Sequence, residues 1–252
     1  MLNCKRADTL LPSGFKPTIN TGAIDPELRM KYQSVIGSLL YLSLGTRPDI
    51  AYAVIKLAQY SSNPSVAHYK AALTIVRYIV WTPDYRLVFN GKANNGLCCW
   101  ADSDWATDSD TRRSQTGYVF KLASSPVCWS SHTQKTVALS STEAEYMSLS
   151  DAARQIRWIQ SLFGEMGFKI TKTPLIGDNM GSLFKASNPV ADKRTKHIDI
   201  KYHHILECVN TGIIDIMFTP TDDQVADILT KNLTRVKFDH YRKKLGIDAR
   251  SA

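Results

Sequence analysis

The chain has 252 residues, of which 44% are hydrophobic and 21% charged, so it can bury a sizeable core and does not have the composition of a disordered polymer. Its formal net charge of +8, concentrated in residues 1–95, favours an anionic partner. The five cysteines form no CxxC pair and no apolar run reaches the roughly 18–20 residues of a membrane span, which argues against a zinc ribbon, a disulfide framework and a membrane protein.

The first third of the chain predicts a linker followed by helices. Residues 1–28 are rich in Pro and Gly without an apolar period, which indicates a linker or an extended arm. A small all-α segment is then expected over residues 29–90, and GKANNG resembles a link to a second domain. Apolar residues recur at helical spacing in three stretches: 32–40, 51–58 and 69–80.

From Leu97 the pattern changes to short strands and later alternates with helices. A long helix is expected to start at Ser140 or Ser141 and to end near Gly167, because Ser140 followed by Glu143 forms a capping-box pattern. The expected strands are LCCWADS, TGYVFKL, VCWSS, TVALS, TPLIGD and IIDIMF, and the other expected helices are NMGSLFKAS, HIDIKYHHILECV and DQVADILTKNL. This order predicts an α/β domain over residues 96–246, with a mixed sheet and helices packed against it.

Acidic residues stand at positions where sites gather. Asp102 and Asp178 end predicted strands, which is where α/β sheets collect ligands, while Asp227 lies in the last predicted helix. Glu143 and Glu145 are two apart and point about 200° away from each other on a helix, so one role cannot cover both. Carboxylates brought together repel unless a cation such as Mg²⁺ or Mn²⁺ lies among them. From spacing alone, ordinary strand-end acids that accept nearby N–H groups remain an alternative.

Five motifs resemble the ribonuclease H domain of copia-type retrotransposon Pol polyproteins. They are, in order, WADSDWATDSDTRRSQTGYVF, VALSSTEAEYMSL, the DN of Asp178-Asn179, RTKHIDIKYHHI and QVADILTK. The preceding stretch from YQSVIGSLLYLSLGTRPDIAYAV to YIVWTP resembles the thumb or connection region that follows the reverse transcriptase palm. The resemblance covers almost the whole chain. It implies a ribonuclease H-like five-stranded mixed sheet with flanking helices, and an enzyme that hydrolyses the RNA strand of an RNA–DNA hybrid.

The resemblance also implies roles for individual residues. The expected catalytic and metal-binding residues, for two Mg²⁺ ions or Mn²⁺, are Asp102, Glu145, Asp178 and a more exposed Asp227, which leaves Glu143 to cap the helix. The expected partners are the RNA–DNA hybrid and the palm of the same polyprotein, in a cytoplasmic virus-like particle or the nucleus. Nucleic-acid contacts are expected from Arg112, Arg113, Ser114, Gln134, Asn179 and Lys196.

Some features depart from the family or leave alternatives open. The palm motifs are missing, so no polymerase activity is expected. Ser131-His132-Thr133-Gln134 stands where related domains usually carry a Lys-rich SKKQ, which puts one substrate contact in doubt. The tryptophans of the second domain are expected in the core. A degenerate copy that binds nucleic acid without cutting it is the main alternative. A DDE integrase is a second one, although that class places its Glu last.

Overall fold

The computed structural model describes residues 6–7, 9–12, 15–89, 96–187 and 196–249, which fold into two compact units. The first, the helical unit, comprises Met1–Phe89, Asp108–Arg112 and Lys231–Ala252. The second, the sheet unit, comprises Asn90–Thr107 and Arg113–Thr230. No helix within the described ranges combines the length and apolar content that crossing a membrane requires.

The helical unit is built on three α-helices, as expected: α1 (Pro26–Gly45), α2 (Ala51–Ala58, preceded by the 3₁₀ turn η1, Pro48–Ile50) and α3 (Val66–Trp81). Asp25 caps α1 by accepting from two backbone N–H groups, and Ser65 and His68 form a capping box on α3. Buried Tyr32 ties α1 to α2, because its hydroxyl donates to the carbonyl of Leu57 at 2.7 Å.

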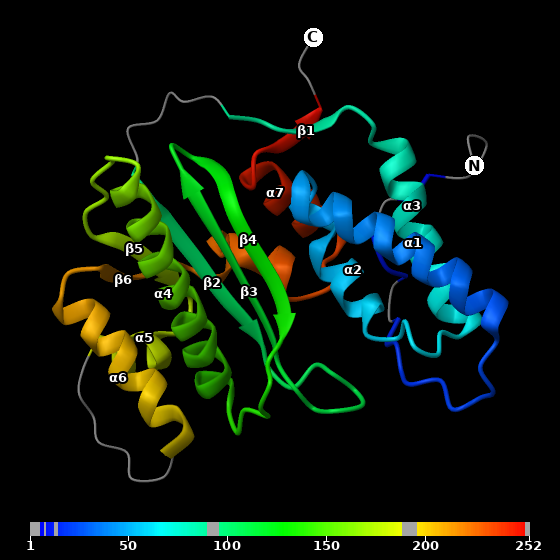
Figure 1. The fold of residues 1–252 in the computed structure, drawn as a ribbon, viewed down its shortest axis with the longest axis horizontal. Helices are drawn as coiled ribbons and strands as arrows, with labels where there is room; N and C mark the ends of the chain where they lie inside the picture. The colour runs from blue at the N-terminus through cyan, green and yellow to red at the C-terminus, as the bar shows by residue number, and fades with distance from the viewer. Residues whose placement is uncertain (1–5, 8, 13–14, 90–95, 188–195, 250–252) are drawn as a thin grey trace. The chain divides into compact units, whose positions relative to one another are not determined.

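The end of the chain belongs to the helical unit. Helix α7 (Arg235–Lys244) leads into strand β7 (Ile247–Ala249), which pairs antiparallel with β1 (Tyr85–Leu87), as Figure 1 shows. The Arg242 guanidinium lies 4.2 Å from the ring centre of Tyr85. The domain expected over residues 96–246 therefore differs from the sheet unit, which ends at Thr230, because pairing with β1 attaches the last residues to the helices.

A five-stranded mixed sheet forms the sheet unit. Its strands are β2 (Cys98–Asp104), β3 (Gln115–Leu122), β4 (Ser125–Thr133), β5 (Thr173–Gly177) and β6 (Ile214–Phe218), in the order β4-β3-β2-β5-β6. The pairs β2–β3 and β3–β4 are antiparallel, whereas β2–β5 and β5–β6 are parallel. The carboxyl ends of β2 and β5 therefore lie at the same edge of the sheet.

Helices cover the sheet and complete its core. The long helix α4 (Ser141–Glu165) lies across one face of the sheet with α6 (Lys196–Asn210) beside it, and α5 (Met180–Ser187) follows β5 (Figure 1). The buried face of α4 repeats at helical spacing through Leu149, Ala152, Ala153 and Ile156, and packs against Leu175 and Phe120 from the strands. The predicted start and length of α4 are confirmed to within about two residues.

Two predicted elements are wrong. The stretch TVALS is not a strand, since β4 ends at Thr133 and residues 134–140 lead directly to α4. The stretch DQVADILTKNL is not an α-helix but the short 3₁₀ turn η3 (Val225–Leu229), every residue of which is buried. The apolar pattern of this stretch reflects burial of the whole turn and not one face of a helix.

Candidate active site

Asp102 and Asp178 meet because neighbouring parallel strands deliver them to one edge. Cys99 and Trp100 of β2 pair with Leu175 and Ile176 of β5, and continuing that register brings Asp102 level with Asp178, the first residue after β5. The Asp102 side chain is 2% exposed. Its carbonyl accepts from the Ser148 hydroxyl at 2.8 Å, which ties β2 to α4.

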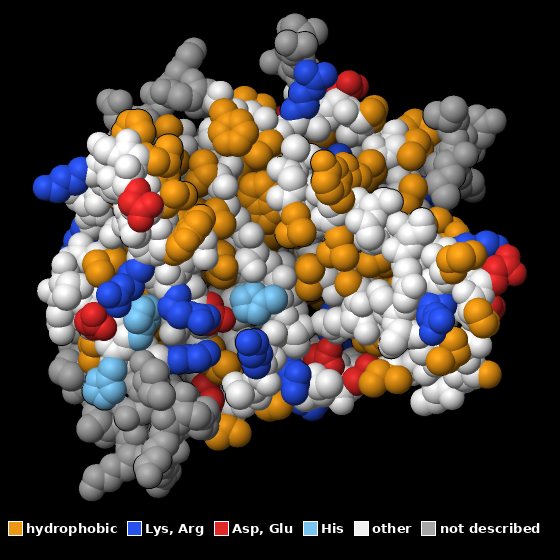
Figure 2. Space-filling view, viewed as in Figure 1, with side chains coloured by type: hydrophobic (Ala, Val, Ile, Leu, Met, Phe, Trp, Pro, Cys, Tyr) orange, Lys and Arg blue, Asp and Glu red, His pale blue; other side chains and the backbone are white. Residues whose placement is uncertain are grey.

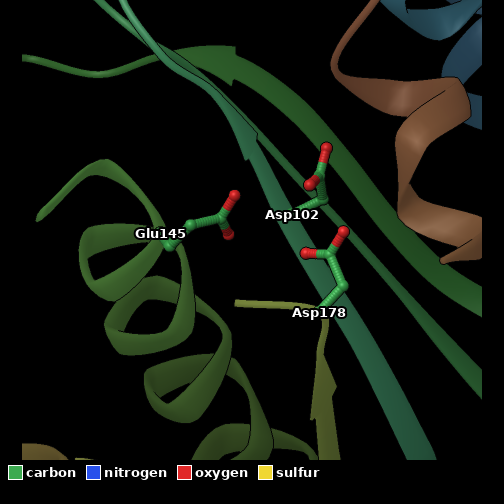
Figure 3. A group of neighbouring side chains, drawn as sticks. All are labelled: Asp102, Glu145 and Asp178. Atoms are coloured by element: carbon green, nitrogen blue, oxygen red, sulfur yellow. The ribbon is translucent and has the colours of Figure 1, made fainter. Parts of the chain in front are cut away.

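Glu145 lies in the N-terminal part of α4, and Glu143, two residues earlier, has a separate role as a capping residue. The Ser140 side chain accepts from the Glu143 N–H at 3.1 Å, while the Glu143 carboxylate accepts from the Leu139 N–H at 2.9 Å. Glu143 therefore closes the entry to the helix, one residue earlier than a capping box would. Glu145, about 200° around the helix, projects toward the sheet edge (Figure 3).

The three carboxylates form a cluster. One oxygen each from Asp102, Glu145 and Asp178 lies within 4.8 Å of the other two, and the side chains point toward one another from β2, α4 and the end of β5 (Figure 3). Three like charges at this distance repel strongly, so the arrangement fits a divalent cation held by oxygen ligands. The donor set, carboxylates alone, is typical of Mg²⁺ or Mn²⁺ and not of zinc, which prefers nitrogen and sulfur ligands.

The fourth expected acid, Asp227, lies on η3 and is outside this cluster of three. The expectation that it is the more exposed acid is wrong, since its side chain is 3% exposed. The reason is close packing of η3 on the sheet: a Cβ on Gly117 of β3 would lie 2.7 Å from Leu229 and 3.2 Å from the carbonyl of Ala226. Its part in metal binding stays a prediction.

The expected nucleic-acid contacts differ in their surroundings. Arg113 is exposed, and Arg112 is exposed in the helical unit with a φ of 57°. Asn179 is partly buried and caps α5 through a bond to the Ser182 N–H. The side chain of Lys196 lies outside the described residues. Ser114 and Gln134 are both buried.

The side chains of Ser114 and Gln134 make hydrogen bonds inside the sheet unit. The Ser114 hydroxyl accepts from the Ala106 N–H, and the Gln134 amide donates both to the Thr116 hydroxyl at 3.0 Å and to the Ala144 carbonyl at 2.9 Å. Gln134 thereby braces the first turn of α4 against β3. Their role as nucleic-acid contacts stays a prediction.

Trp105 was expected in the core, yet its side chain is 47% exposed. Its indole N–H donates to the Ala138 carbonyl at 3.0 Å, so the ring is held in place beside the segment that enters α4. The flanking Val137 and Leu139 are also exposed. Trp100 and Trp129 are half-buried. Trp105, three residues after Asp102 in the sequence, thus forms an ordered, exposed apolar surface beside the segment that enters α4.

A basic surface is formed by His132 of β4, Arg154 and Arg157 of α4, and Lys201 of α6. Figure 2 shows Lys, Arg and His side chains gathered on this face of the sheet unit. Burial lowers the pKa of Lys201 below its ordinary value, and the opposing effect of the nearby Asp151 carboxylate does not cancel this. The Asp151 carboxylate lies among these side chains, 2.5 Å from Arg154 and 3.2 Å from His132. Nothing in the local sequence pattern predicted this surface.

Comparisons with known proteins show the family of the chain. Over 248 residues, 98% of this chain, the sequence is 38% identical to the retrovirus-related Pol polyprotein from transposon RE2 of Arabidopsis thaliana. Over 219 residues, 87% of this chain, it is 35% identical to the corresponding polyprotein from transposon TNT 1-94 of Nicotiana tabacum. The chain belongs to the retrovirus-related Pol polyproteins of transposons. It spans 17% of the first of these Pol polyproteins and 16% of the second.

No protein-family model matches this Pol chain. Among solved structures, the N-terminal RNase H domain of a Mycobacterium tuberculosis protein is similar, with 14% identity and a TM-score of 0.40 over 59% of this chain and 96% of that chain. The expected five-stranded mixed sheet with flanking helices is confirmed for this part of Pol.

Proposed function

We propose that the chain carries the ribonuclease H of a copia-type retrotransposon, which hydrolyses the RNA strand of RNA–DNA hybrids with two divalent cations, Mg²⁺ or Mn²⁺. The observation that carries this proposal is the cluster of Asp102, Glu145 and Asp178, whose oxygens lie within 4.8 Å of one another. Its position at the carboxyl ends of parallel strands is where α/β sheets build sites. The similarity to transposon Pol polyproteins supports the same activity.

The chain's own part in the reaction is to hold charged carboxylates close together and rigid. Asp102 and Asp178 act from the sheet edge and Glu145 from α4, while Asp227 is the proposed fourth ligand. Held by these carboxylates, two such cations would supply activation of a water and charge stabilisation at the leaving oxygen of the phosphodiester. The expected products carry 3′-hydroxyl and 5′-phosphate ends. The bond from Ser148 to the Asp102 carbonyl keeps strand and helix in a fixed relation during this chemistry.

The proposed substrate is a polyanion, and cationic side chains of the sheet unit suit its phosphates. Asp151, which bonds to His132 and Arg154 of the basic surface, lies six positions after Glu145, about 9 Å along the axis of α4. Arg113 is exposed and available for a phosphate, and Asn179, Arg112 and Lys196 remain proposed contacts. Because phosphate contacts release counterions, binding should weaken steeply with salt.

The proposed partner is the reverse transcriptase palm of the same polyprotein, within the cell, in a virus-like particle or the nucleus. A covalently attached palm would hold the hybrid near the carboxylates and raise its effective concentration. Cleavage by the chain alone is therefore expected to need a higher hybrid concentration than cleavage by a longer Pol.

Cleavage of an end-labelled RNA–DNA hybrid tests the proposal, with duplex DNA and duplex RNA as controls and Mg²⁺ or Mn²⁺ as the cation. Glu145→Gln and Asp102→Asn should each reduce cleavage by at least about a hundredfold, an effect of the size seen when a group that stabilises transition-state charge is lost. The matched control is Glu143→Gln, two residues away, whose amide oxygen can still accept from Leu139. It should keep most of the activity.

The outcomes separate the candidate functions. Cleavage that survives Glu145→Gln but fails in Glu143→Gln would reverse the assignment of the two glutamates. A folded chain that binds the hybrid in a salt-dependent way, but cuts nothing even when fused to a palm, would be a nucleic-acid-binding copy without catalysis. Cutting of duplex DNA in preference to the hybrid would contradict the proposed substrate.

A further inference from the structure

A buried hydroxyl contacts the first acid of the cluster. Thr230, the C-cap residue directly after η3, has no exposed surface, and its Oγ1 donates a hydrogen bond to Oδ2 of Asp102. The direction is set by chemistry, since an ionised carboxylate only accepts. The two residues are 128 positions apart, so this bond exists only because η3 packs on the sheet.

The backbone fixes where this hydroxyl lies. The Thr230 N–H donates to the Asp227 carbonyl at 3.2 Å and so closes the turn. Its Oγ1 lies 3.3 Å from the same carbonyl, but the bond to the charged carboxylate is the stronger one. Thr230 therefore links Asp227 and Asp102, the fourth and first acids of the proposed site.

A glycine on the neighbouring strand makes room for this contact. Gly117 of β3 is the residue directly opposite Asp102 in the β2–β3 pair, so a side chain there would stand beside that of Asp102. A Cβ on Gly117 would lie 2.7 Å from Cγ2 of Thr230 and 2.7 Å from Cβ of Leu229. Thr230 thus occupies the space next to Asp102 that any other residue at position 117 would fill.

We propose that Thr230 is a positioning residue, whose hydroxyl fixes the rotation of the Asp102 carboxylate and prepares it to bind a divalent cation. The inference rests on the proposed function, because Asp102 must be a metal ligand. Removing a hydrogen bond to a ligating carboxylate typically lowers metal affinity by 10- to 100-fold. The effect passes through Asp102, so it should appear in metal binding before any substrate is present.

The test measures binding of Mn²⁺ and Mg²⁺ to the intact chain by calorimetry, without nucleic acid. Thr230→Val removes the hydroxyl and keeps the shape, and should weaken metal binding by about tenfold or more. Thr230→Ser keeps the hydroxyl and should stay within about threefold of wild type. The matched control is Thr173→Val, also fully buried in the sheet unit, whose hydroxyl instead accepts from Gln160 at 2.8 Å. It should bind metal like wild type.

Each outcome decides a separate question. If wild type binds no divalent cation, both the proposed function and this inference fail. If wild type binds and Thr230→Val binds equally well, the inference alone is overturned. Equal losses in Thr230→Val and Thr173→Val would also overturn it, as the effect would then be general loosening. Should Thr230→Val not fold, Thr230→Ala and Thr230→Ser differ mainly by one hydroxyl, and equal affinity of these two would refute the role.

Discussion

Gly117→Ala is the perturbation that most directly tests how the sheet unit holds its acids. The added Cβ would lie 2.7 Å from Leu229 Cβ and from Thr230 Cγ2. Ordinary contact between carbon atoms is about 3.5–4.0 Å, so η3 has to move by about 1 Å. Overpacking of this kind costs about 1–3 kcal/mol. The gain of up to about 1 kcal/mol from replacing a flexible glycine offsets part of that cost.

The net expectation for Gly117→Ala is a loss of about 1–2 kcal/mol in the free energy of unfolding. Urea unfolding followed by tryptophan fluorescence measures this loss in the sheet unit. Four of the five tryptophans lie in that unit, and only Trp81 lies in the helical unit. The matched control is Gly164→Ala, at an exposed position near the end of α4, where a Cβ meets nothing within 4 Å. It should stabilise the unit by about 0.5–1 kcal/mol, as Ala exceeds Gly in helix propensity.

Gly117→Ala should reduce metal affinity and hybrid cleavage more strongly than it reduces the folded fraction of the chain. A shift of η3 moves Thr230 away from Asp102 and displaces Asp227, so metal affinity and hybrid cleavage should fall under conditions where the variant is still fully folded. If Gly117→Ala were as stable as Gly164→Ala and bound Mn²⁺ like wild type, the close approach of η3 to β3 would not matter, and the reasoning would be refuted.

Two further predictions concern buried charges. In the helical unit, Lys56 and Asp108 pair at 2.6 Å with side chains 8% and 6% exposed, so Lys56→Met should destabilise by about 3 kcal/mol in thermal unfolding, and a loss below about 0.5 kcal/mol would contradict the pairing. In the sheet unit, burial raises the pKa of Asp151, but bonds to His132 and the charges of Lys201 and Arg154 lower it overall. The ionised Asp151 carboxylate therefore stabilises the fold at pH values above the ordinary carboxyl pKa. This stabilisation is lost as the pH falls through the lowered pKa of Asp151 in the folded chain. The stability gap between wild type and Asp151→Asn should narrow on acidification below about pH 4, and a gap that widens there would refute this sign.

Much of the local structure followed from short sequence patterns. Ser140 and Glu143 marked the start of α4 because an N-cap acts over three residues, and the period of apolar residues identified α1, α2 and α3. Asp102 and Asp178 were expected near each other because each ends a strand, and the parallel pairing of β2 with β5 brings them to one edge. These inferences succeed because the interactions behind them are local or repeat along the chain.

Other features had no local signal. The exposure of Trp105 depends on the segment before α4, which lies 33 residues away and accepts its indole bond. The burial of Asp227 depends on the missing side chain of Gly117, and the attachment of β7 depends on β1. In each case the deciding partner is distant in sequence, so neither periodicity nor propensity could have named it.

The sequence by itself determined the family, the order of most helices and strands, and the residue types that the proposed chemistry needs, because motifs, caps and apolar periods are written in neighbouring residues. Only the tertiary structure decided which carboxylates form a cluster, how η3 packs on β3, and that Thr230 bonds to Asp102. Those outcomes depend on packing between segments that are distant in the sequence, 128 residues apart for Thr230 and Asp102, where the fit of one side chain into the space left by another sets the geometry.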